Sequence, residues 1–287
     1  MFYSLINNNI GLIYIFFLLS GITYKYLSRH YYKNAKNDIA STILTEFITA
    51  LTIFLLIPFF RLDFVMPLKY WILLFISSIF YAFIDLLITI NNKHLPVATT
   101  NLLWRSNMIY ITLIGIFIFH QMPSIKSIFA LILVIIAQII LFYKKQTFKI
   151  SKHEALALLS PLLYSIAIMI DVGISNQINL AFYAGLTLLI PSLILSIIYK
   201  IKPKQIVKEF KSNNKLLFLL TTAWAIFIPS NILAYRQGKI INAVIINSLI
   251  LVGLVLLDFF VDKQKENYKN KFIATILIIV GNIINNV

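Results

Sequence analysis

The sequence has no cysteine, few charged residues and little glycine, and each shortage excludes something. Without cysteine, the chain can form neither disulfides nor thiolate metal sites. Only 12% of its residues are charged, about half the share found in a soluble domain, whereas 60% are hydrophobic and mean hydropathy is +0.88. This composition is that of a polytopic membrane protein. With 8 glycines in 287 residues, close helix contacts are expected from other small residues, such as Ser78 and Ala82.

Acidic residues are also scarce, because 10 Asp and Glu stand against 25 Lys and Arg and leave a net charge of +15. Such a charge suggests nucleic-acid binding only when it forms a basic patch on a folded domain. Here the lysines lie in short links between apolar runs, where basic residues set the orientation of a membrane protein. We therefore expect no nucleic-acid partner.

Motifs of enzymes are missing from the chain. It contains no GxxxxGK[ST] phosphate loop, no GxSxG and no HExxH, which removes ATP-driven transport and two classes of hydrolase. The four histidines lie at the ends of apolar runs and never at metal-ligand spacing. We expect a protein that is not an enzyme and that needs no metal or cofactor.

What is present in abundance is apolar sequence. A membrane-spanning helix needs about 20 mostly apolar residues, and ten runs approach that length. The first has no basic segment before it, so we interpret it as a retained span and not a signal peptide. The links are too short to hold a soluble domain, so the function must reside in the helix bundle. The runs are residues 10–27, 39–60, 70–91, 95–119, 124–143, 155–173, 178–199, 216–235, 240–261 and 271–286.

The chain also repeats itself. When residues 91–126 are laid on residues 236–271, Ala98 falls on Ala243 and Lys126 on Lys271, and the apolar runs agree without a gap. The predicted halves are residues 1–148 and 149–287. Because each half has five runs, an odd number, the halves would enter the membrane in opposite senses. The predicted fold is an all-α integral membrane bundle of ten transmembrane helices, built as two inverted five-helix repeats.

Three short segments carry a family resemblance. One follows a polar corner and opens the fourth run. The other two precede the fifth and tenth runs, where family members show a Gly-Glu pair and then a glycine in the closing span. Gln121 or His120 stands at that pair in the first half and Glu266 in the second, with Gly281 as the closing glycine and Ala137 near the first-half position. The segments read Leu95-Pro96-Val97-Ala98, His120-Gln121-Met122-Pro123-Ser124 and Asp262-Lys263-Gln264-Lys265-Glu266.

On these residues the chain resembles the drug/metabolite transporter superfamily, in its ten-span form with two EamA-like halves. The resemblance implies a secondary transporter, more often an exporter, with both termini in the cytoplasm. Basic residues predict the opposite orientation, because most of the 25 Lys and Arg residues lie in the links after the odd-numbered runs, which places both termini outside. Both orientations stay open at this point.

Three successive runs carry a polar stripe with one charge each: Glu46 in 39–60, Asp85 in 70–91 and Arg105 in 95–119. At about 1.5 Å per residue, Glu46 and Asp85 lie roughly 10 Å from the lysine-rich side and Arg105 about 15–18 Å from it. The long Arg105 side chain is therefore expected to pair with one of the two carboxylates. Two interpretations of this pair stay open. Either Arg105 binds an anionic substrate while the carboxylate exchanges a proton, or the two residues form a buried ion pair that only fixes helix register.

Other polar and aromatic residues complete the predicted site. The two tryptophans lie within runs near polar neighbours, where they either stack on a planar substrate or pack in the core. A helix broken at Pro229 would free backbone carbonyl groups to face a cavity. The nearby Asn231 would then also line that cavity. The predicted substrate-binding residues are Arg105, Asp85, Glu46, Tyr81, Asn101, Trp104, Asn231 and Trp224.

The function that these features predict is secondary transport of a small polar or amphipathic metabolite by alternating access, with either proton coupling or facilitated exchange. The partners are a small-molecule substrate and the lipid bilayer, in a multi-pass protein of the inner (plasma) membrane that is a monomer or a homodimer. Two alternatives remain: a flippase or membrane enzyme for lipid-linked substrates, which predicts a lateral opening, and a scaffold that transports nothing.

Overall fold

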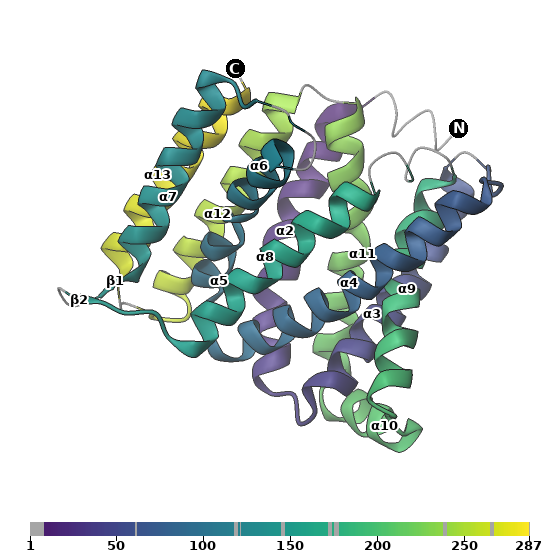
Figure 1. Cartoon of the computed structure of the whole chain (residues 1–287). Coiled ribbons are helices and arrows are strands. Elements are labelled where there is room, and N and C mark those ends of the chain that lie inside the picture. The colour runs from purple at the N-terminus through teal and green to yellow at the C-terminus, as the bar shows by residue number, and fades with distance from the viewer. Residues whose placement is uncertain are drawn as a thin grey trace.

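The computed structural model describes residues 9–286, apart from 61, 118, 119, 121, 145, 146, 172, 173, 175–177, 238, 239, 265 and 266. The chain is all-α apart from one short hairpin (Figure 1). Six described helices are long and apolar enough to cross a membrane, which makes this a multi-pass membrane protein. They are α2 (Ile10–Lys33), α4 (Leu68–His94), α7 (Ile125–Phe142), α8 (Lys152–Asp171), α9 (Leu180–Ile198) and α11 (Asn214–Gln237).

The other predicted runs also form helices, although they are shorter, interrupted or less apolar. Membrane crossing by these segments stays a prediction. They are α3 (Asp38–Phe54), α5 (Val97–Trp104), α6 (Asn107–Phe117), α12 (Ile240–Phe260) and α13 (Tyr268–Asn286). The remaining elements lie in links and are the 3₁₀ turn η1 (Ile57–Phe59), the helix α10 (Pro203–Ser212) and the two-stranded hairpin of β1 (Tyr143–Lys144) and β2 (Thr147–Phe148).

The fourth run is not one continuous helix as predicted, because it breaks between α5 and α6. The Arg105 and Ser106 N–H groups bond three residues back, to the Leu102 and Leu103 carbonyls, at 3.1 and 3.0 Å. The Ser106 hydroxyl also donates to Leu103 at 2.8 Å and competes with the helical pattern. Gln138 of α7 donates to the Leu102 carbonyl at 2.9 Å. The break persists because protein groups satisfy its backbone.

Proline has no such effect in this chain. Helices α8, α9 and α11 continue through Pro161, Pro191 and Pro229. The predicted opening at Pro229 is therefore not found, and α11 keeps Asn231 within a regular helix. Prolines inside membrane helices are tolerated when neighbouring groups take up the freed carbonyls.

Helix α2 extends beyond its predicted end at residue 27 and stops at Lys33. Its last two turns pack through the buried Tyr31 and Tyr32 against Leu44 of α3 and Leu217 of α11.

The bundle is assembled from helix pairs that are far apart in sequence (Figure 1). Helix α2 packs along α11, α4 along α8, α3 along α9 and α7 along α13. Helix α12 also packs on α2, and glycines let these two helices approach closely. A Cβ at Gly21 would lie 2.5 Å from Ile250, and one at Gly253 would lie 2.8 Å from Ile22. Ser78 and Ala82 are buried as expected, but glycine is used in close contacts despite its scarcity.

Replacing Gly21 by alanine is expected to destabilise the protein by about 1–3 kcal/mol, because the added methyl group overpacks the α2–α12 contact. The matched control is Gly115→Ala in α6, where an added Cβ would meet nothing within 4 Å. That change should be neutral or stabilise by up to about 1 kcal/mol, because alanine favours a helix over glycine. Thermal unfolding in detergent measures both. Equal melting temperatures for the two variants would contradict the close packing.

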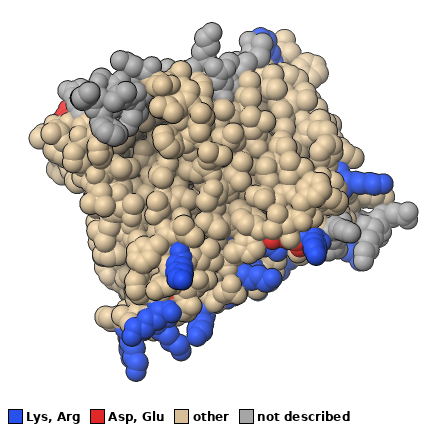
Figure 2. Space-filling model, turned by 180° about the vertical axis from the view of Figure 1, so that it is seen from behind, with Lys and Arg blue, Asp and Glu red and all other residues tan. Residues whose placement is uncertain are grey.

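Basic residues gather at one end of the bundle. Figure 2 shows most of the visible Lys and Arg side chains along its lower edge, below a broad face without charge. This end carries α10, the α2–α3 link and the ends of α4 and α12. We call this end the lysine-rich end. It is the end that holds the links in which the sequence concentrates its basic residues.

Candidate functional site

The interior of the bundle holds a pair of carboxyl groups. Glu46 of α3 and Asp85 of α4 lie close enough for their carboxyl groups to interact electrostatically. Glu46 is completely buried, and within the described part of the chain no donor from another residue reaches its oxygens. Two carboxyl groups can hydrogen-bond to each other only when one of them carries a proton.

Hydrogen bonds between hydroxyl groups join helices α2, α3 and α4 around this carboxyl pair. Tyr32 of α2 bonds Thr45 at 2.8 Å, and Thr42 bonds Thr89 of α4 at 2.7 Å. The charge of Asp85 also acts on Tyr24 and Tyr32 of α2. Sequence analysis missed both tyrosines: Tyr24 lies within the first apolar run, and Tyr32 lies beyond its end. Both tyrosines share one helical face with Gly21, and this spacing is the signal that could have added them to the predicted site.

Arg105 lies at the α5–α6 break and reaches α12. Its Nη2 atom donates to both the backbone carbonyl and the side-chain oxygen of Asn247, at 3.1 Å each. Among the ion pairs of the described residues, none joins Arg105 to Glu46 or Asp85, the partners predicted for it. The break explains the difference, because it takes Arg105 off the helical face that a continuous helix would share with Asn101.

Lys25 lies within the first predicted run, and the structure places it within α2, two turns before the helix ends. Its Nζ atom lies 5.9 Å from the centre of the Phe227 ring on α11. The charge of Arg105 acts on it. Lys25 and Arg105 therefore lie near enough for their charges to interact.

Aromatic side chains surround these groups. Tyr24 stacks on Trp224 with ring centres 5.0 Å apart and an interplanar angle of 9°. Tyr164 of α8 contacts both Trp104, at 5.0 Å between ring centres, and Tyr81, at 6.5 Å. Trp224 thus lies beside the carboxyl pair through Tyr24, while Tyr81 and Trp104 form a separate cluster with Tyr164.

Among the described residues, no hydrogen bond joins the two predicted asparagines to these clusters. Asn101 donates to the Val97 carbonyl of its own helix at 2.9 Å. Asn231 lies half-buried on α11. In the family-like segments, Gln121 and Glu266 lie outside the described residues, so their predicted role is not tested.

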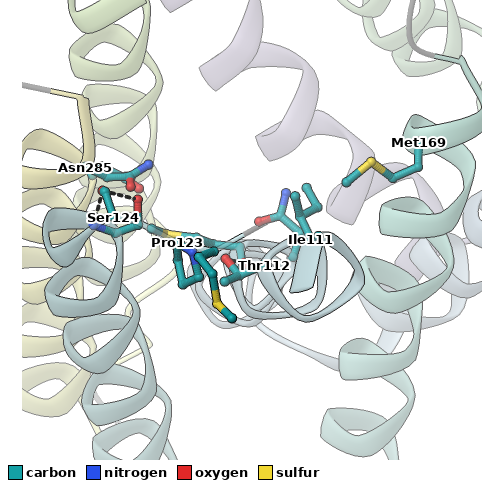
Figure 3. A pocket seen from close by; sticks show the side chains of 12 residues that line it. Ile111, Thr112, Pro123, Ser124, Met169 and Asn285 are labelled. Carbon is teal, nitrogen blue, oxygen red and sulfur yellow. Dashed lines mark hydrogen bonds between the residues drawn. The ribbon is translucent and has the colours of Figure 1, made fainter. Parts of the chain in front are cut away.

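A pocket of about 510 Å³ opens at the end of the bundle opposite the lysine-rich end, between α6, α7, α8 and α13. Its lining is uncharged. In Figure 3, Met169 lies on one side of α6, and Ser124 and Asn285 lie on the other. Asn107, which follows the α5–α6 break by one residue, belongs to the lining. The lining residues are Asn107, Met108, Ile111, Thr112, Gly115, Met122, Pro123, Ser124, Ser127, Met169, Asn282 and Asn285.

The lysine-rich end is held together by an ionic network around Asp258 of α12, whose side chain is 1% exposed. Asp258 accepts a hydrogen bond at 3.0 Å from the backbone N–H of Ala98, in the first turn of α5. Pro96, the N-cap residue of α5, has no side-chain acceptor, so Asp258 caps this helix from another part of the chain. Arg29 of α2 and Lys271 of α13 lie 3.4 and 3.8 Å from its carboxylate.

A second acidic residue extends this network. Asp262, just beyond α12, lies 3.4 Å from both Arg29 and His30 and accepts a hydrogen bond from Tyr26 at 3.1 Å. The network therefore joins α2 and α5 to α12 and α13 at the lysine-rich end, with Asp258 as its buried centre.

Two histidines that are far apart in sequence meet at the same end. The rings of His94, at the end of α4, and His153, at the start of α8, stack with centres 4.0 Å apart. Among the described residues no group of three or more His, Cys, Asp or Glu could hold a metal ion. The stack joins α4 to α8 and offers too few ligands for a metal centre.

The class that the fold defines is a multi-pass helical membrane protein with an interior lined by ionisable groups. No protein-family model matches the chain, and no curated protein sequence matches it. One solved crystal structure resembles it with a TM-score of 0.57 and 13% sequence identity, over 96% of each chain. Its description names neither an activity nor a ligand. At this identity, the likeness shows a shared fold alone.

Proposed function

We propose that this protein is a secondary transporter that moves a small polar or amphipathic metabolite by alternating access between two inverted five-helix halves. The observation that carries the proposal is the pattern of helix pairing. In chain order, α2, α3, α4, α5–α6 and α7 of the first half correspond to α8, α9, α11, α12 and α13 of the second.

Exchanging the halves preserves the observed pairs. The α2–α11 pair becomes α8–α4, which is also packed, while α3–α9, α7–α13 and α5–α12 map onto themselves. A bundle related in this way by a pseudo-two-fold axis is the architecture in which two repeats rock about a central site. The pairing supports ten spans, the boundary between residues 148 and 149, and membership of the EamA-type drug/metabolite transporters.

The two ends of the bundle differ in a way that fits alternating access. A pocket opens between helices of both halves at one end, whereas ion pairs join both halves at the lysine-rich end. Alternating access requires such asymmetry, because one side must be closed while the other is open. With the lysine-rich end in the cytoplasm, the arrangement corresponds to an outward-facing state of a plasma-membrane protein, with both termini outside.

A flippase for lipid-linked substrates is the second candidate, because an apolar groove of about 370 Å³ runs between α2 and α11. It is lined by Phe16, Leu19, Ser20, Thr23, Phe218, Leu219, Thr222, Ala223 and Ile226. Such a groove is the kind of lateral feature that a lipid substrate would use. The helix pairing is common to both candidates, so flux measurements must separate them.

The test is counterflow in proteoliposomes that contain the purified protein, with radiolabelled amino acids, nucleosides, organic acids and polyamines. We expect wild type to exchange one of these classes and Arg105→Ala to lose at least about 90% of that flux, since an interaction of about 1.4 kcal/mol changes a rate tenfold. Lys208→Ala, an exposed lysine on α10, is the matched control and should retain it.

Two results would contradict the proposal. If no class crosses faster than in empty liposomes while a fluorescent phospholipid does, the flippase is the better description. If neither solute nor lipid moves, and Arg105→Ala only lowers the melting temperature, the chain is a scaffold in which Arg105 fixes helix packing.

A further inference from the structure

The pocket opposite the lysine-rich end is a space that the protein's own side chains leave unfilled. It measures about 510 Å³ and lies between α6 and α7 of the first proposed half and α8 and α13 of the second. Binding sites for small molecules typically measure about 300–1,000 Å³ and often lie between the helices of a bundle. The pocket therefore has the size and the place of a ligand site.

Helix α6 forms the most open wall of this pocket. It packs on α7 and α8, yet none of its residues is buried. A Cβ at Gly115 would meet nothing within 4 Å, whereas one at Gly21 would lie 2.5 Å, and one at Gly253 2.8 Å, from a side chain of a neighbouring helix. Glycine thus permits close helix packing at those two positions but faces open space at Gly115. A ligand can approach the backbone closely at such a position.

The polar groups of the lining can both donate and accept hydrogen bonds. Asn107 lies at the start of α6 and Asn285 near the end of α13, and each amide has two donors and an oxygen acceptor. The Thr112 hydroxyl donates to the Met108 carbonyl at 2.8 Å, so its oxygen can still accept a hydrogen bond. Figure 3 shows that Thr112 lies on α6, between the walls formed by the neighbouring helices.

The remaining lining selects against charged ligands and against hydrocarbon chains. None of the described residues that line the pocket is charged, so an ionic ligand would lose hydration there without gaining an ion pair. A hydrocarbon chain cannot satisfy the amide groups. Met108, Met122 and Met169 supply apolar surface that adapts its shape and contacts aromatic rings favourably. An uncharged molecule with hydrogen-bonding groups on an aromatic ring fits all of these features.

We propose that this pocket binds an uncharged molecule with a planar, hydrogen-bonding ring, which is the chemistry of a nucleoside. An asparagine amide can pair with the edge of a nucleobase through one donor and one acceptor. Asn107 and Asn285 offer such amides from α6 and from α13, and the three methionines contact the faces or edges of the ring. That this ligand is also the transported substrate rests on the proposed function.

The test is a thermal-shift measurement on the purified full chain in detergent, with adenosine, thymidine, adenosine 5′-phosphate and putrescine as separate probes. We expect either nucleoside, near 100 times its dissociation constant, to raise the melting temperature of wild type by about 4 °C or more. The two charged probes should produce no shift.

Two variants and a control place the ligand in the pocket. Gly115→Leu should lose the nucleoside shift, because the added side chain fills the open space. The change removes no side-chain hydrogen bond and favours the helix, so the variant should fold. Asn285→Ala should lose most of the shift. Asn214→Ala, which changes an exposed asparagine at the start of α11, should retain it.

The lack of cysteine in the chain permits a second, independent measurement. Ser127→Cys places a single thiol in the pocket lining, and Ser212→Cys places one at the exposed end of α10. At 100 times its dissociation constant, adenosine fills about 99% of the sites. It should therefore slow the maleimide labelling of Ser127→Cys at least about tenfold and leave that of Ser212→Cys unchanged.

Separate outcomes overturn the site, the ligand class and the transport function. A nucleoside shift that survives in both Gly115→Leu and Asn285→Ala, or labelling of Ser127→Cys that adenosine does not slow, places the ligand elsewhere. A shift with a charged probe and none with either nucleoside overturns the ligand class, and no shift with any probe overturns the site. Protection of Ser127→Cys by phosphatidylglycerol micelles alone identifies a lipid instead. If Gly115→Leu abolishes the nucleoside shift but proteoliposomes exchange no solute, the site stands and the proposed function is rejected.

Discussion

Asp258→Asn is expected to produce the largest loss of stability among single substitutions of charged residues. The change leaves Arg29 and Lys271 without the buried carboxylate that they share and weakens the cap on α5. Removing one partner of a buried ion pair costs about 3–5 kcal/mol, because the remaining charge stays buried without compensation. The melting temperature in detergent should fall by about 6 °C or more.

The control for this prediction is Asp38→Asn. Asp38 pairs with Lys93 at 2.6 Å, but both side chains are about a quarter exposed, at 29% and 26%. Exposed pairs contribute about 0–1 kcal/mol, so this variant should melt close to wild type. The double variant Asp258→Asn with Lys271→Met should recover part of the loss, because it removes one of the stranded cations. Equal melting temperatures for the two single variants would show that the network is not a stabilising centre.

Glu46→Gln is expected to abolish the pH dependence of transport without unfolding the protein. A glutamine amide can donate to the Asp85 carboxylate, so the α3–α4 contact survives but no longer needs a proton. If wild-type transport is proton-coupled, a pH difference of one unit supplies about 1.4 kcal/mol per proton and supports about tenfold accumulation of substrate. In proteoliposomes with an imposed pH gradient, Glu46→Gln and Asp85→Asn should show exchange but no accumulation.

Control variants test whether proton coupling depends on the carboxyl pair itself or on the residues around it. Tyr24 and Tyr32 are the titratable groups of α2 on which Asp85 acts, and Tyr32→Phe removes one hydroxyl without touching either carboxyl group. Tyr32→Phe and Asp38→Asn should keep the wild-type response to the gradient. Gradient-driven accumulation that persists in both Glu46→Gln and Asp85→Asn would exclude the pair from proton coupling and leave facilitated exchange as the mechanism.

The sequence by itself determined the membrane class, the places of the helices and the end at which basic residues gather. These properties depend on quantities that vary little with tertiary context: the length of an apolar run, the fixed rise of a helix and the preference of lysine for one side of a membrane. The same arithmetic placed Glu46 and Asp85 at one depth. The structure places them on two helices that pack together, α3 and α4.

What the tertiary structure decided is which groups touch. Arg105 reaches Asn247 because the helix breaks beside it, and the break depends on Gln138 of α7 satisfying a carbonyl 36 residues away in sequence. Lys25 is interior because α2 packs along α11, where its ammonium group lies over the Phe227 ring. Asp258 caps a helix whose own N-cap residue is Pro96. Each of these contacts joins segments distant in sequence, where hydropathy and periodicity specify each helix but not its neighbours.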